Sequence, residues 1–321
     1  MLKFLIFADL HYDPGYLYGT DWSTLEKIQK RAEDNQCDFI IHAGDFCYGP
    51  STTPEFIEAY NSFHIPSYHC LGNHDCDNTP YEETLRLFNM KSNYYYFDCK
   101  GYRIIVLDTN YCKIGDTYVN YSKRNYRAYP AGHDNISPEQ LQWLQDTIDV
   151  SPYPCLLISH ASCERELIIP KDEAELIQLS HEANACKNAA QVRQIIRDAN
   201  KKSPHKVLMV MNGHHHHDFL RILDNVLFWD INSTTYDWVS DKGHDKFPDE
   251  FCKEHVLASH QIAFNDPLTA VVTLDGTSIT IEGTESSYFM GVSREMVGDY
   301  VLDRSGRPTV ARIQSAKLTL L

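Results

Sequence analysis

The chain has 321 residues, with 29 lysines and arginines against 44 aspartates and glutamates, and therefore a formal net charge of −15. This length accommodates one large domain or two smaller ones. The acidic balance argues against a scaffold for nucleic acid, because like charges repel, but a small phosphorylated substrate remains compatible with it when bound cations reverse the local field.

The ten cysteines are scattered without a Cys-x-x-Cys pair, and several lie inside apolar runs. We therefore expect reduced, mostly buried thiols in a reducing compartment such as the cytoplasm. The apolar opening, residues 2–8, is followed at once by Asp9 and His11, so we interpret it as a strand rather than a signal peptide. No apolar run approaches the about 20 residues that span a bilayer, and no membrane association is expected.

The first third of the chain predicts strands that alternate with helices and end in polar residues. Strands are expected over residues 2–8, 39–43 and 67–71, and helices over residues 22–35, 54–63 and 80–88. Continuous apolar runs are typical of strands buried on both faces, and ligand groups in α/β sheets gather just past the carboxyl ends of such strands.

The middle of the chain predicts a hairpin over residues 94–98 and 102–108, followed by a long Tyr-rich loop over 111–133. Ser137 and Pro138 begin a capping box, so a helix is expected to about Asp149. Further elements are strands over 155–159 and 207–211 and mostly helical structure over 164–200.

The C-terminal part predicts two hairpins and a last strand, at residues 219–231, 270–282 and 310–320. The segment 238–266 is polar and irregular. We expect one domain over residues 1–321, in which residues 236–321 form a C-terminal extension that completes the second sheet.

Five apolar runs end in residues that can bind metal ions: Asp9-x-His11, Gly44-Asp45, Gly72-Asn73-His74-Asp75, His160 and Gly213-His214-x-His216. Strand ends in one sheet lie side by side, so these groups can converge. Nitrogen and oxygen ligands without thiolates suit two divalent ions such as Mn²⁺, Fe²⁺ or Zn²⁺ and disfavour a structural zinc site. Two such ions about 3.5–4 Å apart are the usual device for displacement at phosphate esters, and Asp45 is the natural bridging ligand.

In order and in strand-end context, this motif set resembles that of the calcineurin-like metallophosphoesterases, over roughly residues 1–235. The resemblance implies a four-layer αββα sandwich, an α/β fold of two mixed sheets with flanking helices. It also implies a binuclear centre of Mn²⁺, Fe²⁺/Fe³⁺ or Zn²⁺, with a metal-bridging hydroxide as the nucleophile.

The resemblance further implies a role for each motif residue. The first metal would be held by Asp9, His11 and His216, the second by Asn73, His160 and His214, and Asp45 would bridge them. His74 would act on the leaving group or the transition-state oxygen, oriented by Asp75. One departure is the segment after Asp45, where Cys47 or Tyr48 stands at a position that is acidic in many relatives.

The pattern is closest to class III cyclic-nucleotide phosphodiesterases and manganese-dependent nucleotide diphosphatases, because no arginine adjoins a motif as in the protein phosphatases. We therefore expect hydrolysis of phosphodiester or phosphoanhydride bonds in a small nucleotide. Candidate substrate contacts in the Tyr-rich stretch are Tyr111, Lys113, Arg124 and Arg127. The alternatives are a phosphomonoesterase and a non-catalytic binding protein of the same fold, and an oligomer is compatible with the sequence.

The remaining histidines have plainer interpretations. His42 and His69 precede their motifs and are expected to face the core. His215 and His217 alternate with the ligand histidines and are expected to face the other way, in a structural role. Cys163, near His160, is a poor candidate for a nucleophile, because a Cys–His pair would leave the other motifs unexplained.

Overall fold

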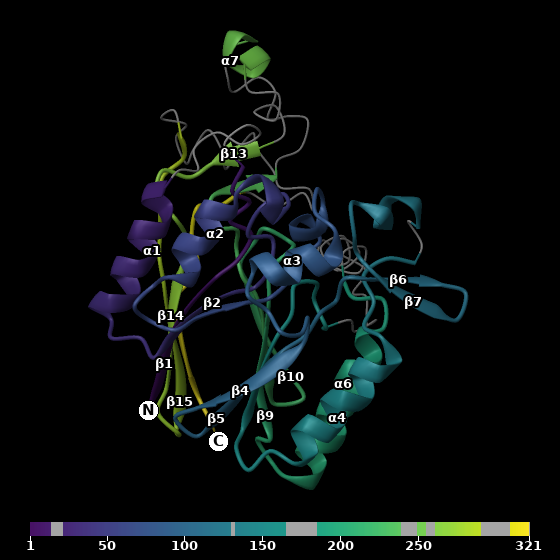
Figure 1. Cartoon of the computed structure of the whole chain (residues 1–321). Helices are drawn as coiled ribbons and strands as arrows, with labels where there is room; N and C mark the ends of the chain where they lie inside the picture. Colours follow the sequence, from purple (N-terminus) through teal and green to yellow (C-terminus); the bar gives the residue numbers. More distant parts are fainter. Residues whose placement is uncertain are drawn as a thin grey trace, which may run out of the picture.

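Two six-stranded mixed sheets lie face to face at the centre of the molecule (Figure 1). The computed structural model describes residues 1–13, 22–129, 132–164, 185–238, 249–254, 261–289 and 309–320. The strand order is β16-β15-β14-β1-β2-β3 in the first sheet and β10-β11-β9-β8-β5-β4 in the second.

The first sheet is built around β1 (Leu2–Phe7), which pairs in parallel with β2 (Phe39–His42) and antiparallel with β14 (Ala270–Leu274). Its other members are β3 (Ser67–His69), β15 (Ser278–Gly283) and β16 (Ala316–Thr319). The C-terminal strands therefore extend the sheet of β1. The expectation that residues 236–321 complete the second sheet is wrong, because the pairing of β14 with β1 joins segments that are far apart in sequence.

The second sheet contains β4 (Tyr95–Cys99), β5 (Tyr102–Val106), β8 (Cys155–Ile158), β9 (Val207–Asn212), β10 (Phe219–Leu223) and β11 (Val226–Asp230). The buried strands β5, β8, β9 and β11 run parallel, as expected from their continuous apolar sequences. Both predicted hairpins of this region, β4–β5 and β10–β11, are confirmed.

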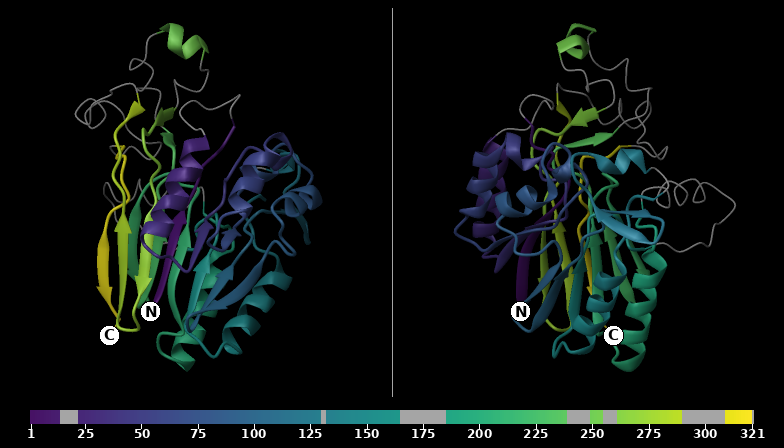
Figure 2. Two further views of the ribbon diagram at one scale, coloured as in Figure 1. Left: turned by 60° about the vertical axis from the view of Figure 1, so that its left-hand side comes forward. Right: turned by 45° about the vertical axis from the view of Figure 1, so that its right-hand side comes forward.

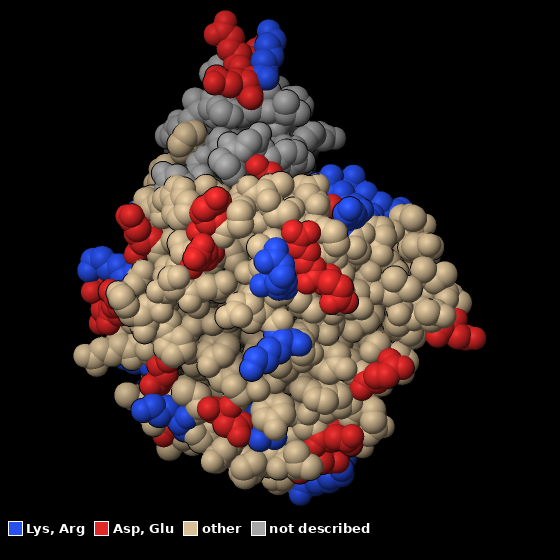
Figure 3. All heavy atoms as spheres, viewed as in Figure 1, with Lys and Arg blue, Asp and Glu red and all other residues tan. Residues whose placement is uncertain are grey.

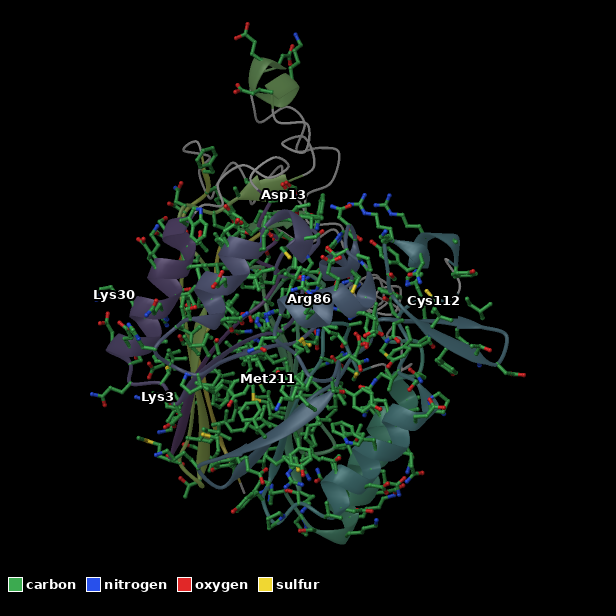
Figure 4. All side chains as sticks on the ribbon, in the orientation of Figure 1. Lys3, Asp13, Lys30, Arg86, Cys112 and Met211 are labelled. Carbon is green, nitrogen blue, oxygen red and sulfur yellow. The ribbon has the colours of Figure 1, made fainter. Side chains whose placement is uncertain are left out.

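Three apolar layers separate four structural layers, which confirms the expected αββα sandwich (Figure 2). Between the sheets lie residues such as Phe4, Ile104 and Met211, and Met211 appears near the middle of Figure 4. One outer layer consists of α1 (Trp22–Asp34), α2 (Pro54–Asn61) and α3 (Tyr81–Leu87), and the other of α4 (Pro138–Asp149) and α6 (Ala189–Lys202).

The Tyr-rich stretch is not the structureless loop that the sequence suggested. It contains a hairpin of β6 (Tyr111–Ile114) and β7 (Thr117–Asn120) and a 3₁₀ turn over Asn125–Ala128. The hairpin closes through Gly115, whose φ is 61°, and Asp116, a pair suited to a tight turn. Each strand of this hairpin has four residues, and β7 alternates exposed with half-buried residues, so the apolar alternation in the sequence is weak.

Two predicted stretches lie partly outside the described residues. In the helical stretch expected over 164–200, the structure describes 164 and 185–200, which include most of α6. The irregular segment begins at Trp238, the last residue of β12 (Tyr236–Trp238), and contains the short α7 (Asp249–Glu254) and β13 (Gln261–Ala263), which pairs with β12.

The described surface carries charges of both signs. In the face shown in Figure 3, lysine and arginine are interspersed with aspartate and glutamate. Within the described part of the chain, no helix has both the length and the apolar character needed to cross a membrane. The nine cysteines whose side chains are described are free thiols, and eight of them are buried.

Candidate metal centre

The strand ends bring the predicted ligands together at one place. Ligand atoms lie within 4.8 Å of one another in three overlapping groups: Asp9, His11 and His216; His11, Asp45 and His74; and Asp45, His160 and His214. These residues follow β1, β2, β3, β8 and β9, so both sheets contribute to the cluster.

Asp9, His11 and His216 form one side of the cluster. His11 Nε2 lies 3.0 Å from His216 Nε2 and 3.8 Å from Asp9 Oδ1, and His216 Nε2 lies 3.4 Å from Asp9 Oδ1. Metal–ligand bonds of about 2.1 Å place neighbouring ligand atoms about 3–3.5 Å apart. The three residues therefore fit one ion with little adjustment.

His160 is at the middle of the other side. Its Nε2 atom lies 3.1 Å from Asn73 Oδ1, 3.1 Å from His214 Nδ1 and 3.2 Å from Asp45 Oδ2. This mixed set of imidazole, amide and carboxylate atoms fits a second divalent ion.

Asp45 connects the two sides. Its Oδ2 atom lies 3.6 Å from His11 Nε2 and 3.2 Å from His160 Nε2, while Oδ1 accepts the backbone N–H of His74 at 2.8 Å. One carboxylate oxygen thus faces a ligand of each proposed ion, as a bridging ligand must.

Backbone carbonyls fix the rings of two histidines that are predicted ligands. His160 Nδ1 lies 2.9 Å from the carbonyl oxygen of Ala43, and His216 Nδ1 lies 3.2 Å from that of Tyr236. Donation from Nδ1–H to these carbonyls selects the tautomer whose Nε2 lone pair faces the cluster.

The backbone at these ligands is strained. Asp9, His11, Asp45, His214 and His216 all have φ between 51° and 73°, in the left-handed region that residues other than glycine seldom adopt. Strain of this kind costs on the order of 1–3 kcal/mol per residue and concentrates at functional sites. Five of the seven predicted ligands share it.

The motif glycines are needed because ligand side chains approach them closely. A Cβ atom at Gly44 would lie 2.3 Å from His160 Nδ1, one at Gly72 2.1 Å from Asp45 Oδ1, and one at Gly213 2.4 Å from Asp9 Oδ2. Any larger residue would therefore displace a ligand. The sequence alone places these glycines in the metal-binding motifs and does not reveal this packing role.

The protonation preferences of the cluster follow from its burial and its carboxylates. Burial lowers the pKa of His11 well below its usual value, and burial together with His160 lowers the pKa of His214 to about 3, so both rings are neutral, the form that binds metal. Burial also opposes the charged form of His160, but Asp45 outweighs it and raises the pKa of His160 to about 10. Burial by itself raises the pKa of Asp45, yet His160 holds it well below its usual value.

Asp77, not Asp75, contacts the ring of His74. His74 Nδ1 lies 2.7 Å from Asp77 Oδ2, whereas Asp75 accepts the backbone N–H groups of Gly72 at 2.8 Å and Cys47 at 3.0 Å. The expectation that Asp75 orients His74 is therefore wrong. The segment His74–Cys76 is a 3₁₀ helix, in which residues three apart eclipse each other, and this geometry brings Asp77 to His74.

Asp75 fixes the turn that carries Asn73 and His74. It is fully buried, and burial followed by repulsion from Asp45 raises its pKa to about 7. Its two backbone contacts connect this turn to the segment after Asp45.

Asp77 is held by two residues of the Tyr-rich segment. Arg124 Nε lies 2.9 Å from Asp77 Oδ2, and the hydroxyl of Tyr126 donates to Asp77 Oδ1 at 2.7 Å. An arginine therefore does lie next to the cluster, although none is near it in sequence. Asp77 and Tyr126 were missed, and only the spacing of Asp77 from His74 was a usable signal.

The other predicted substrate residues lie differently. Tyr111 is buried, and its hydroxyl oxygen accepts a hydrogen bond from Asn93 at 2.8 Å, so its ring does not present an open face. Lys113 and Arg127 are exposed, and Lys113 lines a pocket of about 520 Å³ with Tyr118, Lys187 and five other residues. The structure therefore places Arg124 next to His74 and leaves Lys113 and Arg127 on the surface.

Aromatic side chains adjoin His11 and His74. Tyr48 is buried, packs against both rings at centroid distances of 5.1 and 4.7 Å, and shares a 3.1 Å hydrogen bond with the hydroxyl of Tyr236. His42 and His69 are buried and contact each other at 2.7 Å, as expected of core histidines, and Cys163 is fully buried.

Comparisons with known proteins give one family match and structures of similar fold. The family model for calcineurin-like phosphoesterases matches residues 2–218, whereas no curated protein matches the chain. A dimetal phosphatase from Danio rerio has a similar structure, with a TM-score of 0.60 and 13% identity over 89% of this chain and 98% of that one. GAP50, described as the anchor in the inner membrane complex of Plasmodium, has a TM-score of 0.54 and 12% identity over 100% of this chain and 89% of its own. At such identities the likeness shows a shared fold.

The position of Asp45 predicts that Asp45→Asn disrupts both halves of the centre. Elemental analysis of wild-type protein supplied with Mn²⁺ should give two ions per chain, and the variant should lose most of both, because the amide lacks the charge that bridges two cations. Asp266→Asn, which changes an exposed carboxylate, should keep two. A folded wild-type sample with one ion or none would contradict the assignment.

The close approach of Gly44 to His160 gives a second prediction. Gly44→Ala and Gly276→Ala both place a side chain at φ near 90°, but only Gly44 has neighbouring atoms within 4 Å of the new Cβ. Both variants should lose about 1 kcal/mol of folding free energy to backbone strain. Only Gly44→Ala should also lose bound Mn²⁺, and equal metal contents in two folded variants would contradict the packing argument.

Proposed function

Because the chain belongs to the calcineurin-like phosphoesterase family, we propose that it is a metal-dependent hydrolase of phosphodiester or phosphoanhydride bonds in small nucleotides. The observation that carries the proposal is the location of Asp45 Oδ2, which faces ligands of two adjacent sets at 3.6 and 3.2 Å. A buried site with two such sets is suited to a pair of divalent ions.

The proposed centre assigns three residues to each ion and one to both. When bound, two divalent ions neutralise a phosphate and lower the pKa of water. Asp9, His11 and His216 would hold one ion, Asn73, His160 and His214 the other, and Asp45 both. The carbonyls of Ala43 and Tyr236 keep His160 and His216 in the tautomer that this task requires.

His74 is the proposed acid–base group. Its side chain is 21% exposed, so it reaches the solvent side of the centre, and its ring lies 5.1 Å from that of His11. Burial lowers its pKa, but Asp45 and then Asp77 outweigh burial and raise it. A protonated His74 with Nδ1 held by Asp77 would present its second N–H to a leaving oxygen.

The substrate class is inferred from the Tyr-rich segment, which reaches the centre through the contacts of Arg124 and Tyr126 with Asp77. The segment also contains exposed Tyr129, half-buried Tyr118 and two cations, Lys113 and Arg127. Aromatic faces and separate cations suit a nucleobase with phosphate. A diester or anhydride has groups on both sides of phosphorus and therefore gains from such a neighbouring surface.

Arg124 favours a second candidate, a phosphomonoesterase. Its Nε atom contacts the carboxylate that holds His74, and its side chain is 33% exposed. A planar guanidinium can grip two oxygens of a terminal phosphate dianion. A third candidate, a non-catalytic binding protein, is disfavoured by the complete ligand set and by His74, although a similar structure is described as an anchor.

Removal of His74 should separate chemistry from metal binding. His74→Ala should leave the Mn²⁺ content unchanged and lower the turnover number by ~10²–10⁴, the range for a general acid–base group. His64→Ala, an exposed histidine, should change neither. If the metal content of His74→Ala falls in step with turnover, His74 is a ligand and the assigned role is wrong.

The substrate class is tested with paired model compounds. The Mn²⁺-loaded protein should hydrolyse bis(p-nitrophenyl) phosphate faster than p-nitrophenyl phosphate. Arg124→Ala should affect both compounds to a similar extent, since Arg124 would act through Asp77. A preference for the monoester that Arg124→Ala abolishes would instead establish the phosphomonoesterase.

Tyr129 tests the contribution of the aromatic surface. Tyr129→Ala should raise the Michaelis constant for cyclic AMP more than that for bis(p-nitrophenyl) phosphate, which has no nucleobase. Tyr153→Ala is the matched control, because Tyr153 is 37% exposed and Tyr129 is 38% exposed. Equal effects of Tyr129→Ala on the two substrates would count against base stacking at this residue.

A further inference from the structure

The loop between β9 and β10 directs its histidines to two places. His214 and His216 belong to the paired centre, whereas His215 and His217 meet Asp230, the last residue of β11. His215 Nδ1 lies 3.4 Å from Asp230 Oδ2, and the rings of His215 and His217 are stacked at a centroid distance of 5.4 Å. The alternation predicted from the sequence is thus confirmed, and the second set has a carboxylate partner.

The second set is close enough to share an ion. One ligand atom from each of the three residues lies within 4.8 Å of the other two. The side chains of His215 and Asp230 are each 1% exposed, so the solvent competes little for them. Asp230 is held in the sheet, where it is opposite Asn212 of β9 and Phe219 of β10.

The donor chemistry of the three residues favours zinc. Two imidazoles and one carboxylate are a common zinc set, with the fourth position taken by water or another ligand. Imidazole nitrogens favour zinc over manganese, since affinity for such sites rises along the series from Mn²⁺ to Cu²⁺ and remains high for Zn²⁺. His215, His217 and Asp230 therefore favour zinc more strongly than the paired centre does, because the paired centre has a larger share of oxygen ligands.

A metal-free ionic cluster is the competing interpretation. Asp230 also acts electrostatically on Arg221, which pairs with Glu164. In that case, the carboxylate of Asp230 would interact electrostatically with both His215 and Arg221, without a metal ion. The two interpretations differ in whether the chain binds zinc when the paired centre is disabled.

We propose that His215, His217 and Asp230 bind one zinc ion, separate from the paired centre. This ion joins the β9–β10 loop to the end of β11. Because His214 and His216 alternate with its ligands in the same loop, zinc at this site restricts the backbone that positions two ligands of the paired centre.

The experiment uses the full chain with Asp45→Asn as background, so that zinc binding is measured without reference to hydrolysis. Competition of the metal-free protein with a chromogenic zinc chelator should show one tightly bound zinc ion. Adding His217→Ala or Asp230→Asn should weaken that binding by at least ~10-fold, as even the loss of an outer partner of a ligand does. Adding His64→Ala should leave it unchanged.

Circular dichroism establishes that each variant is folded. If the Asp45→Asn background does not fold, wild-type protein saturated with zinc should bind three ions and His217→Ala two. A folded background that binds no zinc, or equal zinc binding with and without His217, would overturn the proposal. Because this readout needs neither substrate nor turnover, its failure is distinct from failure of the proposed hydrolase function.

Discussion

The site depends on the buried carboxylate of Asp45, which lies between His11 and His160 and contacts both rings. A carboxylate that is 1% exposed requires compensating positive charge, because burial of an unpaired anion is costly. In the metal-free chain the compensation comes from His160, whose pKa Asp45 raises to about 10 despite burial. Divalent ions would provide the same compensation to Asp9 and Asp45, the two carboxylates among the ligand groups of this cluster.

The fold brings these side chains together, and the backbone of several of them is strained as a result. Five of the predicted ligands have left-handed backbone, and three glycines leave room for the side chains of His160, Asp45 and Asp9. Neither feature improves the packing of the apolar layers. Backbone strain of this kind is expected where a protein holds functional groups in one arrangement, because the surrounding sheets impose the geometry.

The sequence revealed those parts of the site that come directly after strands. Asp9, Asp45 and His160 follow continuous apolar runs, and the shared edge of a sheet makes their convergence foreseeable. Asp77 was not foreseeable in this way, because its contact with His74 depends on a local 3₁₀ turn. Arg124 was predicted as a substrate contact of the Tyr-rich segment, but its place beside Asp77 and His74 was not, since that depends on tertiary packing.

Fold prediction failed where pairing is not local. The hairpins β4–β5 and β10–β11 were predicted from adjacent residues and short turns, but the pairing of β14 with β1 joins opposite ends of the chain. The apolar sequences of β1 and β14 do not specify which strand each one pairs with. The hairpin β6–β7 was overlooked because its strands are short and partly exposed, so that hydrophobic alternation was weak.

Anomalous X-ray diffraction from crystals of the Mn²⁺-loaded protein, recorded on both sides of the manganese absorption edge, tests the central claim most directly. The proposed arrangement predicts two peaks about 3.5–4 Å apart, on either side of the Asp45 carboxylate. A single peak, or peaks that do not contact Asp45, would contradict it.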